Sequence, residues 1–161
     1  ESLNLAAVMK LPIIFVIEDN LYAVNSPESA RRSPRFSRRM VCEGLGVRFL
    51  DCDGNDFESV YWQASMLAKY VRSGKGPAVL HARTYRQMAH SGPITDESVR
   101  VIDTKEVRIE NDPITNLLRM LPEYAKHEIY ETVNSEVKAA WLQAKESKDP
   151  DPIHQKSITY A

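Results

Sequence analysis

The feature that most constrains the fold is a succession of strand, helix and strand in the middle of the chain. The first strand is predicted around Val47–Cys52 and ends in an Asp-Gly turn, and the second is predicted at 77–82, PAVLHA. Between them, from Asp56 to Ser73, apolar residues recur at the spacing of an amphipathic helix, with Asp56 as N-cap. Short connections make this a βαβ unit, and its right-handed crossover makes the sheet parallel.

A further strand is predicted at 12–17, PIIFVI, because a short, continuous, β-branched apolar run is typical of a strand buried on both faces. The helix predicted before it, at 1–10, is stopped by Pro12 and has little polar face, so we expect it to be covered on most sides. Since the chain also lacks an initiating Met, we expect it to be a piece of a longer polypeptide. The predicted fold class is α/β, a parallel sheet flanked by helices.

The second half of the chain is predicted to be helical after a long irregular stretch. One helix is expected at 112–121, with Asp112 as its cap, and a last helix at 123–147. The Pro-punctuated residues 148–161 are interpreted as a tail or linker, which leaves 1–147 as one partial domain. Two segments show no periodicity and are predicted to be loop, 18–38 and 83–112.

Composition limits the class of partner. The 161 residues are 43% hydrophobic and 27% charged, which is ordinary for a globular domain, and their formal net charge is −1. The chain therefore has no net positive charge that would attract nucleic acid or an anionic membrane, and we expect neither as a partner. No apolar run is long enough to span a bilayer, and no signal-peptide pattern is present. Cys42 and Cys52 fit no metal-ligand spacing, so we interpret them as thiols in a reducing cytoplasm.

Polar residues follow the strand predicted at 12–17, where the sequence continues Glu18-Asp19-Asn20-Leu21-Tyr22 without Gly or Pro. In open parallel sheets, ligands bind outside the carboxyl ends of the strands. Carboxylate, carboxamide and main-chain oxygens at such a place are what magnesium takes, together with phosphate and water. The alternative is an Asx-turn with exposed carboxylates, and spacing alone favours that alternative.

A second polar segment includes the end of the strand at 77–82 and reads HARTYRQMAHS. Arg86 and His90 follow that strand, with Ser91 beside them, and a cation and an imidazole there could bind a diphosphate or transfer a proton. The alternative for His90 is a solvated loop histidine, which spacing alone favours. His81 lies inside the strand and is predicted to be a packed core residue.

The segment 30–39, ARRSPRFSRR, is strongly basic. Its five arginines are Arg31, Arg32, Arg35, Arg38 and Arg39. Such a cluster of arginines could bind an anion or an acidic protein partner. A solvated loop is the preferred interpretation, phosphate or protein contact comes second, and the net charge places nucleic-acid binding third.

Five runs along the chain, taken together, resemble one known family. They are ESLNLAAVMKLPIIFVIEDNLYAV, GVRFLDCDGNDFESV, VRSGKGPAVLHARTYR, AHS and DPI, and they span residues 1 to about 146. Their order is similar to that in the alpha subunit, or alpha half of a fused chain, of the thiamine-diphosphate-dependent decarboxylating component of 2-oxo acid dehydrogenase complexes. That family includes the pyruvate, branched-chain and acetoin enzymes. The resemblance implies the C-terminal part of a thiamine-diphosphate-binding fold.

The resemblance also implies roles for particular residues. The side-chain oxygen of Asn20 and the main-chain carbonyl of Tyr22 match ligands of a magnesium ion that bridges the diphosphate of thiamine diphosphate to the protein. His90 matches a histidine that contacts this diphosphate and is implicated in reductive acylation of the lipoyl group. Arg86 matches an arginine that helps to anchor the loop that carries this histidine. Ser91 matches a serine of the loop that is phosphorylated in some mitochondrial members.

The sequence departs from the family's pattern at several places. The Gly-Asp-Gly that supplies an Asp ligand would precede Glu1, and the glutamate that activates the cofactor's pyrimidine ring lies on the beta subunit or half. The loop after His90 is longer than the family's, with Thr95-Asp96-Glu97 in place of Ser-Asp-Asp and Val99 in place of Tyr. The chain is therefore expected to carry half of an active site.

By this resemblance the expected function is oxidative decarboxylation of a 2-oxo acid with acyl transfer to lipoamide. The expected partners are the beta subunit or fused beta half, in a heterotetramer, and the lipoyl acyltransferase component. The expected compartment is the cytoplasm of a bacterium or the mitochondrial matrix of a eukaryote. Two alternatives stay open: another thiamine-diphosphate enzyme, such as an acetoin dehydrogenase or a transketolase-like protein, and a non-catalytic fragment that serves as an interaction module.

Overall fold

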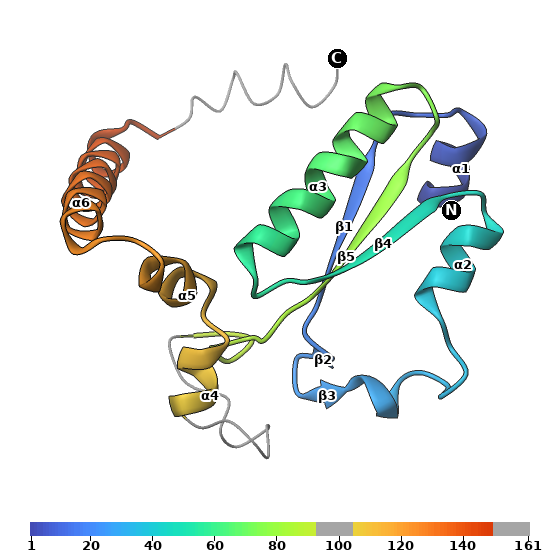
Figure 1. The fold of residues 1–161 in the computed structure, drawn as a ribbon, viewed down its shortest axis with the longest axis horizontal. Coiled ribbons are helices and arrows are strands. Elements are labelled where there is room, and N and C mark those ends of the chain that lie inside the picture. The colour runs from blue at the N-terminus through green and yellow to red at the C-terminus, as the bar shows by residue number, and fades with distance from the viewer. Residues whose placement is uncertain (93–104, 150–161) are drawn as a thin grey trace. The chain divides into compact units, whose positions relative to one another are not determined.

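A three-stranded parallel sheet lies at the centre of the N-terminal part of the protein (Figure 1). The computed structural model describes residues 1–92 and 105–149. The strands are β1 (Ile14–Asp19), β4 (Arg48–Asp53) and β5 (Ala78–Arg83), in the spatial order β1-β5-β4. Both neighbours run parallel to β5, so the predicted α/β class with a parallel sheet is confirmed.

Each strand continues one or two residues beyond its predicted end, into polar sequence. The ladder between β1 and β5 extends to Glu18 beside Ala82 and to Asp19 beside Arg83. Glu18 and Asp19, which the sequence assigned to the turn, therefore belong to the strand. Apolar patterning could not reveal this, because main-chain hydrogen bonds hold these positions whatever their side chains.

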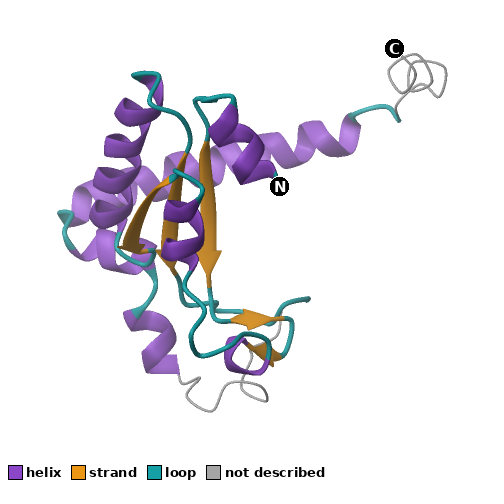
Figure 2. Ribbon diagram, turned by 90° about the vertical axis from the view of Figure 1, so that its right-hand side faces the viewer, coloured by secondary structure: helices purple, strands orange, loops and turns teal. Residues whose placement is uncertain are grey.

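Helices cover both faces of the sheet (Figure 2). On one face, α3 (Phe57–Arg72) buries Leu67 and Val71 against the β5 side chains of Leu80 and Ala82. On the other face, residues of α1 (Ser2–Val8) and α2 (Arg38–Gly44) pack around Phe49 and Val79. Alternation along a strand therefore directs successive side chains to different helices.

Two expectations about burial need correction. β5, not β1, is the strand buried on both faces, because β5 has a neighbour on each side. β1 is an edge strand of the described sheet, and its Val16 is 59% exposed. The first helix was expected to be covered on most sides, whereas within the described residues its Val8 is 74% exposed.

The predicted helix caps are confirmed. The Asp56 side chain accepts hydrogen bonds from the amides of Glu58 and Ser59 at the start of α3. Asp112 likewise accepts from the amide of Ile114, at 3.1 Å, at the start of α5 (Pro113–Arg119). The last helix, α6, spans Glu123–Glu146, close to its predicted bounds. Caps are predictable because they depend on residues within a few positions of one another.

The two segments predicted to be loop contain short elements, and there the prediction is wrong. Within 18–38 lie a small hairpin and a single helical turn: β2 (Tyr22–Ala23), β3 (Ser26–Pro27) and the 3₁₀ helix η1 (Glu28–Ala30). Within 83–112 lies α4 (Lys105–Glu110). Such elements are too short to show a periodic pattern and form because of their tertiary surroundings.

The chain divides into two compact units, one of Glu1–Arg119 and one that begins at Met120. Helix α6 belongs to the second unit, and its side chains, among them Trp141, are not buried within the described residues. The predicted boundary of a partial domain at 147 stays a prediction. Of the helices that the structure describes, none combines the length and the apolar character needed to cross a membrane.

Candidate functional site

The carboxyl ends of the three strands meet at one edge of the sheet, beside a hollow. Its lining includes Glu18, Asn20, Asn55, Thr84 and Arg86. Two of the residues predicted from the sequence, Asn20 and Arg86, are thus brought to the same hollow from different loops. Open α/β sheets bind their ligands at this edge.

Two successive Asx-turns shape the chain after β1. The amide of Leu21 donates to Asp19 Oδ1 at 3.1 Å, and the amide of Tyr22 donates to Asn20 Oδ1 at 3.0 Å. Leu21 has a φ of 66°, in the left-handed region that leucine rarely adopts. The Leu21 carbonyl accepts from the Glu28 amide at 2.7 Å. The predicted Asx-turn is therefore present, and since an amide oxygen has two lone pairs, Asn20 Oδ1 keeps one for another partner.

The loop after β5 is tied to the ends of both neighbouring strands. The amide of Thr84 donates to the Asp19 carbonyl at 3.0 Å, and the amide of Tyr85 donates to Asn55 Oδ1 at 3.1 Å. Gly54 approaches the same loop so closely that an added Cβ would lie 2.5 Å from Thr84 Cγ2. The Asp-Gly turn at the end of β4 is thus required by close packing as well as by local turn chemistry.

Arg86 joins the two loops that border the hollow. Its Nη2 donates to the Val24 carbonyl at 2.9 Å, and Val24 has a φ of 56°. A guanidinium hydrogen-bonded to a main-chain carbonyl fixes a loop in a conformation that valine would not otherwise favour. Arg86 therefore anchors the hairpin of β2 and β3.

His90 and Ser91 lie further along the loop that follows β5, and both are exposed. The residues that differ from the family's loop, Thr95-Asp96-Glu97 and Val99, lie outside the described residues. The site residues implied by the resemblance thus fall into two groups. Asn20, Tyr22 and Arg86 belong to a framework of hydrogen bonds, and His90 extends from it into solvent.

His81 is buried as predicted, but it is not an ordinary core residue. It is 7% exposed and lies between two carboxylates, with Nδ1 at 2.7 Å from Asp51 Oδ1 and Nε2 at 2.9 Å from Asp19 Oδ2. This cluster was not predicted from the sequence. His81 and Asp51 each lie within a predicted strand, and in the sheet they occupy paired positions on β5 and β4. This pairing can be recognised only once the order of the strands is known.

Both carboxylates are held in their ionised form. Burial on its own would raise the pKa of Asp19, but the hydrogen bonds with His81 and the Leu21 amide and the charge of Arg38 outweigh burial and lower that pKa. Burial opposes ionisation at Asp51 too, and there the hydrogen bonds with His81 and Arg39 lower the pKa. Two ionised carboxylates thus face one imidazole.

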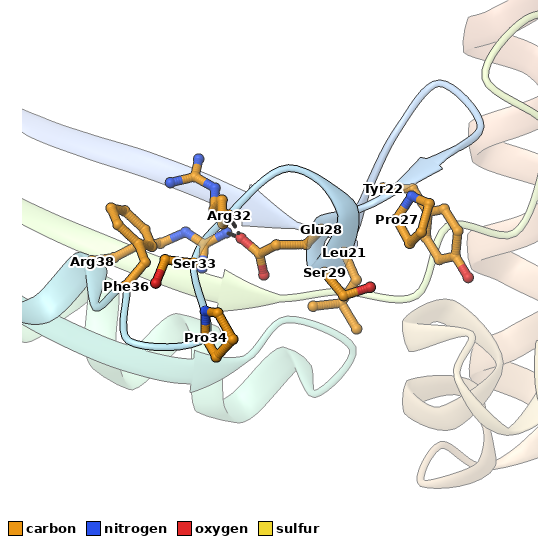
Figure 3. Close-up of a pocket in the computed structure, with 10 residues that line it drawn as sticks. All are labelled: Leu21, Tyr22, Pro27, Glu28, Ser29, Arg32, Ser33, Pro34, Phe36 and Arg38. Atoms are coloured by element: carbon orange, nitrogen blue, oxygen red, sulfur yellow. Dashed lines mark hydrogen bonds and ion pairs between the residues drawn. The ribbon is translucent and has the colours of Figure 1, made fainter.

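Arginines of the basic segment complete this cluster. Arg38 pairs with Asp19 at 3.0 Å, and Arg39 pairs with Asp51 at 2.5 Å. Arg32 and Arg38 also meet at the carboxylate of Glu28, on the wall of a second hollow (Figure 3). Three of the five arginines are therefore paired with carboxylates of the same chain. All but Arg38 are nevertheless exposed, as the interpretation of a solvated segment expected.

The amino-acid sequence of the chain is similar to those of known proteins of one family. A family model described as "Dehydrogenase E1 component" matches residues 1–156. The chain is 30% identical over 166 residues to "Pyruvate dehydrogenase E1 component subunit alpha" of Rickettsia bellii, covering 99% of this chain and 49% of that protein. It is 39% identical over 116 residues to the testis-specific mitochondrial form of the same subunit of Homo sapiens, covering 71% of this chain and 29% of that protein.

A relative named for a different 2-oxo acid matches at an identity close to that of the Rickettsia bellii protein. Identity to "2-oxoisovalerate dehydrogenase subunit alpha" of Bacillus subtilis is 29% over 161 residues, covering 94% of this chain and 46% of that protein. The chain spans about half the length, or less, of the curated relatives named here. The resemblance to the alpha type of decarboxylating component, with its thiamine-diphosphate-binding fold, is confirmed. The chain belongs to the dehydrogenase E1 component family.

Proposed function

We propose that this chain holds the metal and diphosphate of the cofactor in the alpha part of a 2-oxo acid dehydrogenase decarboxylating component. The observation that carries the proposal is the turn after β1. It brings Asn20 to a hollow that Arg86 also lines, at the ligand-binding edge of the sheet, and ties the Tyr22 amide to the Asn20 carboxamide. The family match over residues 1–156 supports the same assignment.

The donor set fits a magnesium ion bound together with a diphosphate. Asn20 Oδ1 keeps a lone pair beside its bond to the Tyr22 amide, and the main-chain carbonyl of Tyr22 is proposed as the second neutral ligand oxygen. Magnesium is usually held by few protein oxygens and completes its shell with substrate phosphates and water. The two oxygens from this chain are neutral, so the charge of the ion would be balanced by the diphosphate and by the Asp ligand that the family's Gly-Asp-Gly supplies.

Thiamine diphosphate, when bound, supplies the nucleophilic carbon and the electron sink for decarboxylation. The residues of this chain bind and orient. Arg86 holds the hairpin after the turn through the Val24 carbonyl. Exposed His90 is proposed to contact the diphosphate and to assist acyl transfer, because its imidazole is accessible to an incoming lipoyl group.

The proposed reaction is oxidative decarboxylation of a 2-oxo acid with acyl transfer to lipoamide. Relatives named for pyruvate and for 2-oxoisovalerate match with similar identity, so the proposal names the class of 2-oxo acids. The proposed partners are a beta subunit or fused beta half, which would supply the glutamate for the pyrimidine ring, and the lipoyl acyltransferase component.

The proposal is tested by titrating thiamine diphosphate into the intact alpha–beta protein in the presence of magnesium. Asn20→Ala should abolish magnesium-dependent binding, measured by titration calorimetry. Asn25→Ala is the matched control, because it removes an exposed carboxamide from the neighbouring hairpin turn. Unchanged affinity in Asn20→Ala would reduce the segment to a structural turn and refute the proposal.

A further inference from the structure

A row of charged and polar side chains crosses the sheet beneath the turn that carries Asn20. It begins at Arg39 and passes through Asp51 of β4 and His81 of β5 to Asp19 of β1. His81 is the central member, because β5 lies between the other two strands. Both of its ring nitrogens have a carboxylate partner, at 2.7 and 2.9 Å.

The Asp19 carboxylate is the point at which this row reaches the turn. Its Oδ2 faces His81 Nε2 and Arg38, and its Oδ1 accepts from the amide of Leu21. Asp19 is buried, so each of these contacts compensates for lost hydration. A carboxylate held on both oxygens has one orientation, and that orientation fixes the position of the Leu21 amide.

Leu21 is the residue that needs this support. Its φ of 66° is unfavourable for a side chain with a Cβ, and hydrogen bonds at its amide and its carbonyl hold it in this conformation. Leu21 lies between the two proposed ligands: Asn20 precedes it, and the peptide bond after Leu21 sets the direction of Tyr22. The left-handed conformation of Leu21 therefore determines how the two proposed ligands are oriented relative to each other.

We propose that His81 is the positioning residue of this turn: it orients Asp19, which holds Leu21 in its left-handed conformation and so fixes the oxygens of Asn20 and Tyr22. The role in metal binding rests on the proposed function, whereas the role in ordering the turn does not. His81 lies beneath the turn and acts only through Asp19. Asp51, held by Arg39, orients the imidazole from the other side.

The two nitrogens of the imidazole allow a matched pair of variants. A glutamine amide reaches the position of Nε2, and an asparagine amide reaches only the position of Nδ1. His81→Gln should therefore keep the link to Asp19, and His81→Asn should keep only the link to Asp51. Both variants remove the ring and its packing against Phe49, so they share any general loss of stability.

The first measurement is hydrogen–deuterium exchange of the intact protein without cofactor. In His81→Asn, amides of residues 20–24 should exchange about tenfold faster or more. The reason is that the Asp19 carboxylate, which accepts the hydrogen bond from the Leu21 amide, is no longer oriented by His81. In His81→Gln these amides should exchange at nearly the wild-type rate. Val79→Ala, which opens the same face of β5 two residues earlier, should leave residues 20–24 protected. Equal exchange in His81→Asn and His81→Gln would overturn the inference.

The second measurement is the dissociation constant of thiamine diphosphate at fixed magnesium. His81→Asn should weaken binding by about tenfold and leave kcat at saturating cofactor unchanged, because the turn is loosened and the reacting groups are intact. In a Leu21→Gly background the same substitution should have little effect, since glycine adopts this φ without support. A full effect in that background would overturn the inference.

The outcomes separate the two proposals. If wild-type protein shows no magnesium-dependent binding while exchange follows the expected order, the proposed function fails and the positioning of the turn by His81 stands. If His81→Asn does not fold, Asp51→Asn replaces it, because this change weakens the hold on Nδ1 while the imidazole stays in place. A turn as protected in Asp51→Asn as in the wild type would overturn the inference.

Discussion

The Nε2 atom of His81 lies 2.9 Å from the Oδ2 atom of Asp19, although the two residues are 62 positions apart in the chain. This contact joins the central strand of the sheet to the end of its neighbour, directly before the turn that carries Asn20. Because the strands are hydrogen-bonded in a fixed register, the contact is a property of the sheet as a whole. It connects the stability of the fold to the geometry of the proposed ligands.

We predict that His90→Ala lowers acyl transfer to lipoamide more than it lowers decarboxylation. Its exposed imidazole is suited to meet an acceptor that arrives from solvent. The two activities are measured in the intact enzyme, one with lipoamide and one with an artificial electron acceptor. Ser91→Ala, at the adjacent exposed position, is the control. Equal losses in the two assays would assign His90 to cofactor binding alone.

We predict that Gly54→Ala lowers the free energy of unfolding by about 1–3 kcal/mol, the usual cost of overpacking. The new methyl group would lie 2.5 Å from Thr84 Cγ2 and 2.9 Å from the Arg83 carbonyl oxygen. Gly44→Ala is the matched control, since a Cβ there meets nothing within 4 Å. Urea denaturation measures both, and adding Thr84→Ser to Gly54→Ala should restore part of the loss. Equal stability of the two alanine variants would contradict the close approach.

We predict that the free energy of unfolding falls as the pH is lowered below the ordinary pKa of an aspartate, about 3.9. The pKa of Asp51 is lowered in the folded protein, where hydrogen bonds with His81 and Arg39 outweigh the effect of burial. The stability that this carboxylate contributes is complete above the ordinary pKa, about 3.9, and is lost as the pH falls through the lowered value. Urea denaturation at a series of pH values measures the loss.

The matched variants for this prediction are Asp51→Asn and Glu18→Gln. In Asp51→Asn the free energy of unfolding should fall less steeply with decreasing pH, because the titrating carboxylate is removed. Glu18→Gln should leave the decline unchanged, since it removes an exposed carboxylate from the same edge of the sheet. A decline of the same steepness in both would mean that other carboxyls dominate acid unfolding.

We predict that Asp56→Ala lowers the free energy of unfolding by about 1 kcal/mol, the usual cost of a lost N-cap. Its carboxylate accepts from the amides of Glu58 and Ser59, which have no partner within the helix. Asp56→Asn keeps an acceptor oxygen and should recover most of the stability. Thermal unfolding of the three proteins tests this, and a loss in Asp56→Asn as large as in Asp56→Ala would contradict a capping role.

Much of the candidate site could be predicted because it follows the strand ends. Asn20 comes directly after β1 and Arg86 shortly after β5, and parallel strands bring these ends together. The Asp19–His81–Asp51 cluster could not be predicted in this way. His81 was interpreted as a core residue, which is correct for its burial, but a single sequence does not reveal which side chains meet it.

The strand–helix–strand unit, the caps at Asp56 and Asp112, and the polar ends of the strands could all be predicted from the order of the amino acids. These features depend on residues close together in the chain, where periodicity and capping chemistry act. The position of β5 between β1 and β4, and therefore the contacts of His81 with Asp19 on one side and Asp51 on the other, became visible only in the folded protein. The reason is that strand order and register arise from packing across the whole sheet, which joins residues far apart in the sequence.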